Sequence, residues 1–413
     1  MSDVTIITAA WVAPIAAPII REGAVVIDGN RIVAVGAARD LRSTYPDARH
    51  HDVGDALLLP GLVNAHAHLE LSGCAAGDSP ASFIEWIASL QGKLGPAPDF
   101  AAAAKAGAGQ SLSFGVTAAG DISQHCHITR PALRDGPLRV VSYGEAIGIG
   151  VSRRKVDERL ARAIDRSTAS DRLTIGLSPH APYSLERDDY FRVARTACEL
   201  NLPLATHLNE LPYEREFLER RSGPFRELLE RLGLWQDEIE TFAGSPMQLA
   251  KAAGLVHSPT ALFAHVNYCD DDELAALASG QASVVYCPRT HAYFGHPPHR
   301  WRDMLAAGIN VAVGTDSCAS SPDLNLVDDL RLLHRIAPDV PAQTLWEMAT
   351  IRGARAIAQQ SLVGSIEVAK AADLTIFLVQ SDDPLTEILE SSALPAEVWI
   401  AGRRISHATM ERS

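Results

Sequence analysis

The stretch that decides the fold is PGLVNAHAHLELS, residues 60–72, in which an apolar run ends in two histidines separated by one alanine. Residues two apart in a β-strand point to the same face, so His66 and His68 would direct both imidazoles at one target, whereas in a helix they would diverge. The apolar run before them is typical of a buried strand. We therefore expect a strand that ends in a pair of metal-capable side chains.

Seven more apolar runs of the same kind follow along the chain, and segments with helical periodicity separate them. The eight runs cover residues 61–68, 114–121, 138–146, 173–180, 202–210, 261–267, 282–288 and 309–317. Alternation of this kind indicates a parallel sheet built from βα units, and eight parallel strands are the number that closes a barrel. The sequence thus predicts an α/β fold with a (β/α)8 TIM barrel over residues 58–361.

The sequence pattern at both ends of the chain differs from the alternating strands and helices of the middle. Residues 1–57 contain short β-type runs broken by turn signals, among them Asp28-Gly29, which is a strong hairpin signal. Residues 362–413 return to the same pattern. We expect these two pieces to pair into one small β-sandwich domain beside the barrel.

Composition excludes several classes of protein. Of the 413 residues, 47% are hydrophobic and 21% are charged, which excludes general disorder. The formal net charge of -13 would repel nucleic acid, and no apolar run reaches the length of about eighteen residues that suggests a membrane partner. The six cysteines have neither CxxC nor framework spacing, which favours free thiols and a cytoplasmic location. A homo-oligomer is possible on these data.

Metal-capable side chains stand at the carboxy ends of the predicted strands, where barrel enzymes carry their reactive groups. They are His66, His68, His180, His207, Glu210, His265 and Asp316. Three imidazoles and one carboxylate, from His66, His68, His207 and Asp316, suit a divalent zinc or iron ion with one position left for water. A metal ion can lower the pKa of such a water to about 7, which would supply a hydrolase with its nucleophile.

Glu210 follows His207 by three residues, so its carboxylate can approach water without being a ligand, as a general acid/base requires. The alternative is an ordinary glutamate in the first turn of a helix. A lone histidine at a strand end, such as His180 or His265, is more often a hydrogen-bonded structural residue than a functional one. The presence of all these residues in one register favours a metal site.

Loops predicted at the same mouth hold five more histidines: His125, His127, His291, His296 and His299. For the HxH pair after the second strand, a substrate contact or solvent exposure is favoured over a second metal site. We interpret the Pro- and Gly-containing segment 290–301 as substrate-facing. Residues 211–256 are longer than one connection needs, which is typical of a lid.

These motifs resemble those of the amidohydrolase superfamily, and more closely its branch of aminohydrolases that includes S-adenosylhomocysteine, aminodeoxyfutalosine, guanine and cytosine deaminases and the triazine chlorohydrolases. PGLVNAHAHLELS looks like the signature of strand one, SPHAPYS (178–184) like the substrate loop of strand four, and FIEWIASL (83–90) like the aromatic segment after strand one. THLNE (206–210) is similar to the HxxE motif and GTDS (314–317) to the aspartate of strand eight. The likeness covers nearly the whole chain.

The resemblance implies one divalent ion, Zn²⁺ first with Fe²⁺ or Mn²⁺ as alternatives, bound by His66, His68, His207 and Asp316. The branches with two metals have a carbamylated lysine at the end of strand four, and residues 173–181 contain no lysine. The catalytic residues implied are Glu210, His265 and Asp316, which would shuttle a proton, orient the attacking water and protonate the leaving amine. The resemblance implies that His180 contacts the substrate, and the other candidate substrate contacts are Asn209, His125, His291 and Trp86.

The reaction implied is hydrolytic deamination of an amino-substituted heterocycle, a small-molecule substrate of the aminopurine nucleoside type, with release of ammonia. A chlorohydrolase or cyclic amide hydrolase of the same superfamily would need the same metal and similar carboxylates. A non-catalytic structural relative should have lost ligands, and this chain retains all of those expected. Two positions depart from the family pattern, because Asn209 stands where many relatives have alanine and Ala369 replaces the usual glycine.

Overall fold

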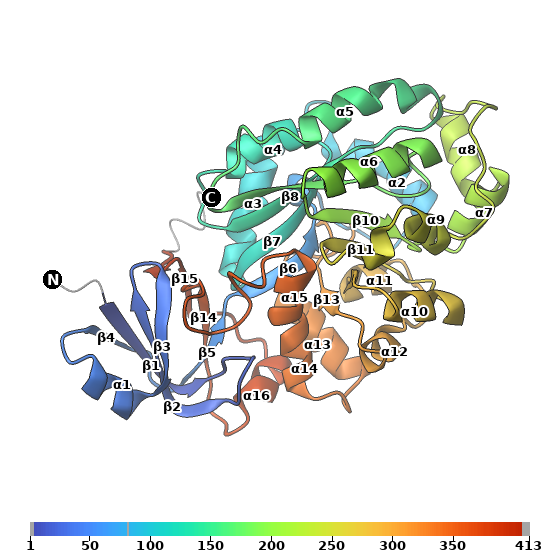
Figure 1. The fold of residues 1–413 in the computed structure, drawn as a ribbon. Helices are drawn as coiled ribbons and strands as arrows, with labels where there is room; N and C mark the ends of the chain where they lie inside the picture. The colour runs from blue at the N-terminus through green and yellow to red at the C-terminus, as the bar shows by residue number, and fades with distance from the viewer. Residues whose placement is uncertain (1–3, 81, 407–413) are drawn as a thin grey trace.

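The computed structural model describes residues 4–80 and 82–406 of the chain, which form a barrel and a smaller β-sheet domain (Figure 1). The predicted domains extend to residues 1 and 413, so residues 1–3 and 407–413 of that prediction lie outside the described part. In Figure 1 the small domain lies at one end of the molecule, away from helices α7 and α8.

Eight parallel strands form the barrel, which confirms the predicted (β/α)8 fold. They are β6 (Leu62–Ala67), β7 (Val116–Ser123), β8 (Arg139–Glu145), β9 (Leu173–Ser178), β10 (Leu204–Leu208), β11 (Ala261–His265), β12 (Ser283–Tyr286) and β13 (Val311–Val313). Each strand pairs with the next along the chain, and the backbone N–H of Asp316 closes the ring by donating to the carbonyl of His66 at 3.0 Å. Nearly every residue of these strands is buried, because side chains fill the inside and helices cover the outside.

Helices connect the strands and continue beyond the last one. They are α3 (Phe100–Ser113), α4 (Cys126–Leu133), α5 (Val156–Ala163), α6 (Arg187–Glu199), α10 (Asp271–Ala278), α11 (Pro288–Tyr293), α12 (Trp301–Ala306), α13 (Leu326–Ile336), α14 (Ala342–Met348) and α15 (Ile351–Ala356). Side-chain caps fix several starts: Asp99 accepts from the N–H of Ala102 at the start of α3, and Asp270 with Glu273 forms a capping box on α10.

Additional elements surround the carboxy ends of the strands. They are the short helices η1 (Leu69–Leu71) and η2 (Gly150–Lys155), the helix α2 (Phe83–Leu94), and, within the long segment 211–256, α7 (Glu214–Arg220), α8 (Pro224–Arg231) and α9 (Pro246–Ala252), which the short turn η3 (Leu255–His257) follows. Phe83 of α2, Phe217 of α7 and Phe225 of α8 belong to one buried apolar cluster, so α2 and the long segment pack together. This packing forms one wall of the cavity described below.

The small domain is a sheet built from both ends of the chain, as predicted. Its strands are β1 (Val4–Val12), β2 (Ile20–Asp28), β3 (Arg31–Ala37), β4 (Arg49–Asp52), β5 (Ala56–Pro60), β14 (Leu374–Leu378), β15 (Glu397–Ile400) and β16 (Arg403–Arg404), with helices α1 (Ala38–Thr44) and α16 (Pro384–Glu390). Antiparallel pairing of β5 with β14 joins the two ends, and the predicted hairpin turn lies at Gly29, where φ is +57°. The boundary predicted between residues 57 and 58 falls within β5.

Two contacts fix the small sheet against the barrel. Arg139 at the start of β8 donates to Asp373, and the hydroxyl of Thr375 in β14 donates to the carbonyl of Gly115, at 2.5 and 2.7 Å. Between the two units Gly61 passes so close to Thr117 that a Cβ on Gly61 would lie 2.0 Å from the Thr117 hydroxyl oxygen. Across residues 4–80 and 82–406, no helix has the length and apolar character needed to cross a membrane.

Candidate active site

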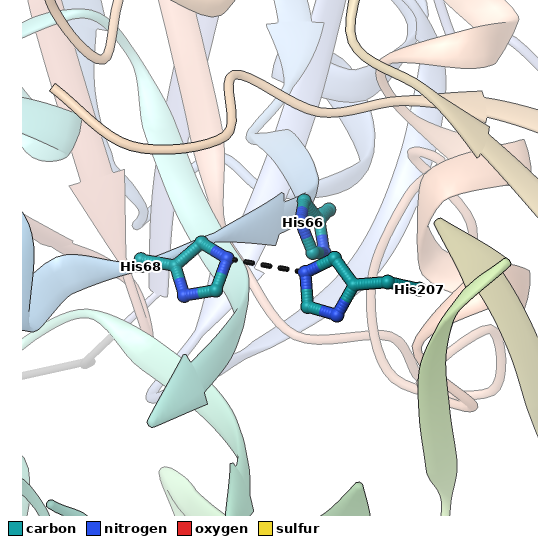
Figure 2. A group of neighbouring side chains, drawn as sticks. All are labelled: His66, His68 and His207. Carbon is teal, nitrogen blue, oxygen red and sulfur yellow. Dashed lines mark hydrogen bonds between the residues drawn. The ribbon is translucent and has the colours of Figure 1, made fainter. Parts of the chain in front are cut away.

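Three histidines from opposite sides of the barrel, at the ends of β6 and β10, converge at its carboxy end (Figure 2). The rings of His66 and His68, from the end of β6, have centroids 5.0 and 5.4 Å from that of His207 in β10. Nδ1 of His207 lies 3.1 Å from the carbonyl of His180, and a carbonyl can only accept, so the neutral His207 ring keeps its lone pair on Nε2. That Nε2 faces Nε2 of His68 at 3.4 Å. A cation between the two nitrogens would satisfy both.

His66 gives the clearest sign that the site is built for a cation. Its side chain is fully buried, and neither ring nitrogen has a hydrogen-bond partner among the described residues. Buried polar atoms in native proteins are nearly always paired, so an orphaned imidazole next to two others calls for a ligand that all three can bind. The residues present therefore fit a metal ion.

Asp316 completes the predicted ligand set. It follows β13 with a positive φ of 59°, and its Oδ1 lies 3.9 Å from Nε2 of His66 and 3.6 Å from Nε2 of His68. Burial raises the pKa of Asp316 to about 7, and a cation among these groups would lower it again. The structure thus brings together the three imidazoles and the carboxylate that the sequence predicted.

The protonation of the histidines suits metal binding. Burial lowers the pKa of His68 to about 3 and that of His207 to about 4, with further lowering at His68 from neighbouring His207. Burial likewise lowers the pKa of His66 well below its ordinary value. At neutral pH the rings are neutral, which is the form in which imidazole binds a metal.

Glu210 lies beside this cluster, on the turn that follows β10. Its Oε1 is 3.7 Å from Nε2 of His265, and its Oε2 accepts a hydrogen bond from the Tyr183 hydroxyl at 3.0 Å. Burial raises the pKa of Glu210 well above its ordinary value, and the charge of Asp316 adds to this effect. A carboxyl group in such an environment can hold and release a proton near neutral pH, as general acid/base chemistry requires.

Glu214 holds the turn on which Glu210 stands. Its carboxylate accepts from the backbone N–H groups of Asn209, Glu210 and Leu211, at 3.1, 2.7 and 3.0 Å. The side chain of Asn209 donates to Glu273 of α10 at 2.8 Å and is not among the residues that line the cavity. Asn209, predicted as a substrate contact, therefore points away from the substrate space, because a positive φ of 49° turns it toward α10.

His265 is the last residue of β11 and faces the cluster, with its ring centroid 5.2 Å from that of His66. Within residues 4–80 and 82–406 its Nε2 has no hydrogen-bond partner. The backbone of His265 is in the left-handed region, with φ of 72°, and its carbonyl accepts from Nε2 of His299 at 2.8 Å. His299 thus holds the strand end that presents His265.

The segment after β12 differs from its prediction as a substrate-facing loop. It begins with helix α11, and Nδ1 of His291 lies 3.1 Å from Oδ1 of Asn267. His291, His296 and His299 are absent from the cavity lining, whereas Phe294 belongs to it. His291, a predicted substrate contact, is thus placed by α11 against its protein neighbours and outside the lining of this cavity.

A cavity of about 530 Å³ opens above the cluster. It is lined by His125, His180 and Trp86, three of the residues predicted to contact substrate, whereas the exposed His127 does not line it. Trp86 donates its ring N–H to the carbonyl of Ala319 at 2.9 Å, which fixes its ring in the wall. The remainder of that wall is apolar and comes from α2 and α8, with Phe83, Ile87, Leu90, Phe225, Leu228 and Leu229.

Sequence reasoning missed Glu145, the last residue of β8. It lines the cavity, is 5% exposed, and its Oε1 lies 3.6 Å from Nε2 of His180. The signal was available, because Glu145 falls at the carboxy end of a predicted strand, where the other reactive groups were sought. The apolar residues of α8 gave no such signal, since their contact with the cavity depends on the path of the long segment 211–256.

The chain is similar in sequence and in fold to several known proteins. A 5-methylthioadenosine/S-adenosylhomocysteine deaminase from Moorella thermoacetica is 29% identical over 380 residues, covering 88% of this chain and 83% of the relative. An aminodeoxyfutalosine deaminase from Deinococcus radiodurans is 29% identical over 348 residues, covering 81% of each chain. The crystal structure of Helicobacter pylori aminofutalosine deaminase in complex with methylthio-coformycin superposes with a TM-score of 0.87 at 25% identity, covering 97% of this chain and 100% of that one.

Family-level similarity extends over most of the sequence. Residues 23–48, in the small sheet, match an imidazolonepropionase-like composite domain of bacteria. Residues 57–405 match the amidohydrolase family, a range that includes the barrel and every residue of the cluster described above. The chain belongs to the amidohydrolase family.

Proposed function

We propose that this protein is a metal-dependent hydrolytic deaminase of an amino-substituted heterocycle, with an aminopurine nucleoside derivative as its substrate. One observation carries the proposal: a buried carboxyl group, Glu210, stands beside a cluster of three neutral imidazoles and a carboxylate at the floor of a cavity of about 530 Å³. This volume is within the range that holds a nucleoside-sized molecule. The deaminase names of the relatives support the reaction and the substrate class.

The metal would be held by His66, His68, His207 and Asp316. When bound, one divalent ion would act as a Lewis acid that makes water nucleophilic at neutral pH. We propose zinc, because a set of three imidazoles and one carboxylate with an open position is typical of catalytic zinc sites. The absence of a lysine at the end of β9 supports a single ion.

The chain's own residues would move the protons. Water adds to the carbon that bears the amino group, Glu210 takes a proton from the water, and the same carboxyl delivers it to the adjacent ring nitrogen. His265 orients the attacking water through its unpaired Nε2. Asp316 would take the second proton from the added hydroxyl and pass it to the amino group; the carbon–nitrogen bond then breaks, ammonia leaves, and the ring carbon keeps the oxygen as a carbonyl. His125, His180 and Trp86 would contact the substrate from the cavity wall.

The apolar wall supports a nucleoside derivative over a free base. A purine ring above the cluster would not reach all of the apolar side chains that α2 and α8 contribute, such as Leu90 and Leu228. A sugar and its substituent would extend toward them. The relatives are named for deamination, which favours this reaction over chloride displacement or cyclic amide hydrolysis.

An ammonia-release screen tests the proposal. The purified chain, loaded with zinc, is supplied in parallel with adenosine, methylthioadenosine, S-adenosylhomocysteine, aminodeoxyfutalosine, guanine, cytosine and aminotriazines. We expect zinc-dependent ammonia release from one or more of the nucleosides. Stoichiometric metal binding without ammonia from any of these compounds would refute deamination.

The six free cysteines support a cytoplasmic location, which fractionation of the source cells would test.

A further inference from the structure

Glu145 is a buried carboxyl group to which the proposed reaction gives no task. It ends β8, is 5% exposed, and lines the cavity. Its Oε1 has no hydrogen-bond partner among the residues that the structure describes. Because a buried polar atom without a partner costs free energy, such an atom at a cavity wall indicates a group that binds there.

The neighbour of Glu145 in the cavity wall is His180, and the two present hydrogen-bond acceptors. Nε2 of His180 lies 3.6 Å from Oε1 of Glu145, which is too far for a hydrogen bond between them. Nδ1 of His180 is 2.6 Å from the hydroxyl oxygen of Ser184, and that hydroxyl donates to the carbonyl of Ala181. The Ser184 oxygen therefore accepts from Nδ1, which leaves Nε2 of His180 as an acceptor.

Protein groups nearby do not supply the missing donor. Arg159, which attracts Glu145 electrostatically, donates to the carbonyl of Ile147. Glu70, which also lines the cavity, accepts from the Ser123 hydroxyl and from the backbone N–H of Gln124. It is therefore bonded as an acceptor and is not the missing donor. A carboxylate, or the carbonyl oxygen of a protonated carboxyl, accepts hydrogen bonds, so the pair of Glu145 and His180 calls for a donor from outside the chain.

The position of the pair decides which part of a substrate would reach it. A carboxylate oxygen of Glu145 and ring nitrogens of His180 and His207 lie within 4.8 Å of one another, so the pair adjoins the proposed metal site. The pair comes from β8 and the end of β9, whereas Glu210, His265 and Asp316 come from β10, β11 and β13. If Glu210, His265 and Asp316 hold the reacting carbon of the substrate's heterocycle, the substituents on the opposite side of that heterocycle would approach Glu145.

We propose that Glu145, together with His180, binds hydroxyl groups of the substrate's sugar and so selects nucleosides over free bases. The inference rests on the proposed deamination and adds a specificity residue to it. A sugar hydroxyl donates its proton to the side of the Glu145 carboxylate that faces the cavity, and a second hydroxyl can donate to Nε2 of His180. No bond is made or broken, since the pair positions the substrate and takes no part in proton transfer.

The test compares two substrates in three forms of the zinc-loaded protein. The substrates are the nucleoside that the wild type deaminates fastest and its 2′,3′-dideoxy analogue. For Glu145→Ala we expect kcat/KM to fall by about 10- to 150-fold on the nucleoside, the range for a lost hydrogen bond to a charged group, and by less than about 3-fold on the analogue. Glu145→Gln retains an acceptor oxygen, so its loss on the nucleoside should be smaller. Glu158→Gln, an exposed glutamate on α5, serves as the matched control.

The outcomes separate this inference from the proposed function. Equal losses on both substrates, or no loss on the nucleoside, would overturn the role of Glu145, provided that zinc content matches the wild type. Ammonia release by the wild type from free bases alone would also overturn it and leave deamination intact. If the wild type releases ammonia from no heterocycle, the proposed function fails, and the inference fails with it.

Discussion

Glu210 is a carboxyl group that can both donate and accept a proton beside the proposed metal site. Its hydrogen bond with Tyr183 holds it there, and it is not one of the proposed metal ligands. Tyr183 fixes one carboxylate oxygen and leaves the other directed toward His265. We expect Glu210→Gln to keep stoichiometric metal and to lower kcat by about 10²- to 10⁴-fold, the usual contribution of a general acid/base. Metal analysis and steady-state kinetics measure the two effects. Glu219→Gln, exposed on α7, is the control, and wild-type activity in Glu210→Gln would remove this carboxyl from the mechanism.

Asn209 lies next to Glu210 in sequence, yet its side chain serves the scaffold. It donates to Glu273, so Asn209→Ala should lower the free energy of unfolding by about 1 to 3 kcal/mol through the lost hydrogen bond. Because the side chain does not line the cavity, KM should change by less than about 2-fold. Thermal or urea unfolding and a KM determination check both expectations. A KM raised tenfold with unchanged stability would restore Asn209 as a substrate contact.

At this scale the sequence predicted the ligand candidates better than the substrate contacts. His66, His68, His207 and Asp316 could be found because the carboxy ends of barrel strands converge whatever the details of their loops. The placement of Asn209 outside the cavity lining could not be predicted, because its direction depends on a left-handed backbone that no sequence pattern revealed. The placement of His291 could not be predicted either, because a short helix stands where a loop was expected.

Among the elements, the turn between β10 and α7 decides how the reactive carboxyl is presented. Three backbone N–H groups in this turn, including that of Glu210, donate to Glu214. In Glu214→Gln the amide NH₂ cannot accept, so at least one N–H loses its partner and the turn shifts. We expect kcat to fall by about tenfold or more, since small displacements of a reacting group are costly, with KM and metal content nearly unchanged.

A merely structural role for Glu214 would give a different result. It would lower the melting temperature and leave kcat of the folded fraction equal to that of the wild type. Glu219→Gln on the same helix again provides the comparison, because its side chain is exposed. A loss of metal in Glu214→Gln would place the effect on the ligand set instead of on Glu210.

Some of the secondary-structure elements could be predicted from the sequence more completely than others. Eight apolar runs gave the barrel strands because each must be buried on both faces. The segment 211–256 was recognisable as an insertion by its length, but its packing against α2 was not, since that contact joins two irregular regions far apart in sequence. Phe83 and Phe225 belong to one buried cluster because both segments lie at the same rim of the barrel.

For the whole molecule, the closing seam between the first and last barrel strands positions His66, His68 and Asp316 of the site. Gly314 passes so close to β6 that a Cβ there would lie 2.7 Å from the carbonyl oxygen of His66 and 2.8 Å from its Cβ. We expect Gly314→Ala to lower the free energy of unfolding by about 1 to 3 kcal/mol through overpacking, and to reduce metal content because His66 must move. Unfolding curves and metal analysis measure these effects.

The control for the seam is Gly36→Ala in β3, where an added Cβ would meet only Leu41 at ordinary contact distance. It should bind metal as the wild type does. Full metal content and unchanged stability in Gly314→Ala would show that the seam tolerates extra volume and does not constrain His66.

The arrangement of a barrel and a small β domain was easier to predict from the sequence than the residue at which one ends and the other begins. The two β-rich ends suggested one small domain, and β5 and β14 join them by direct pairing. The boundary predicted after residue 57 fell inside β5 because that strand and β6 form a nearly continuous apolar run, broken only at Gly61, whose closeness to Thr117 the sequence does not reveal.

The hydrogen bond from Asp316 to the His66 carbonyl has a consequence for biosynthesis. The proposed ligands on β6 leave the ribosome early, whereas Asp316 follows β13, the last of the eight barrel strands. A nascent chain therefore lacks a complete ligand set until the last strand has docked against the first. We therefore expect metal to bind only after the ring has closed, and to enter through the same cavity that would admit the substrate.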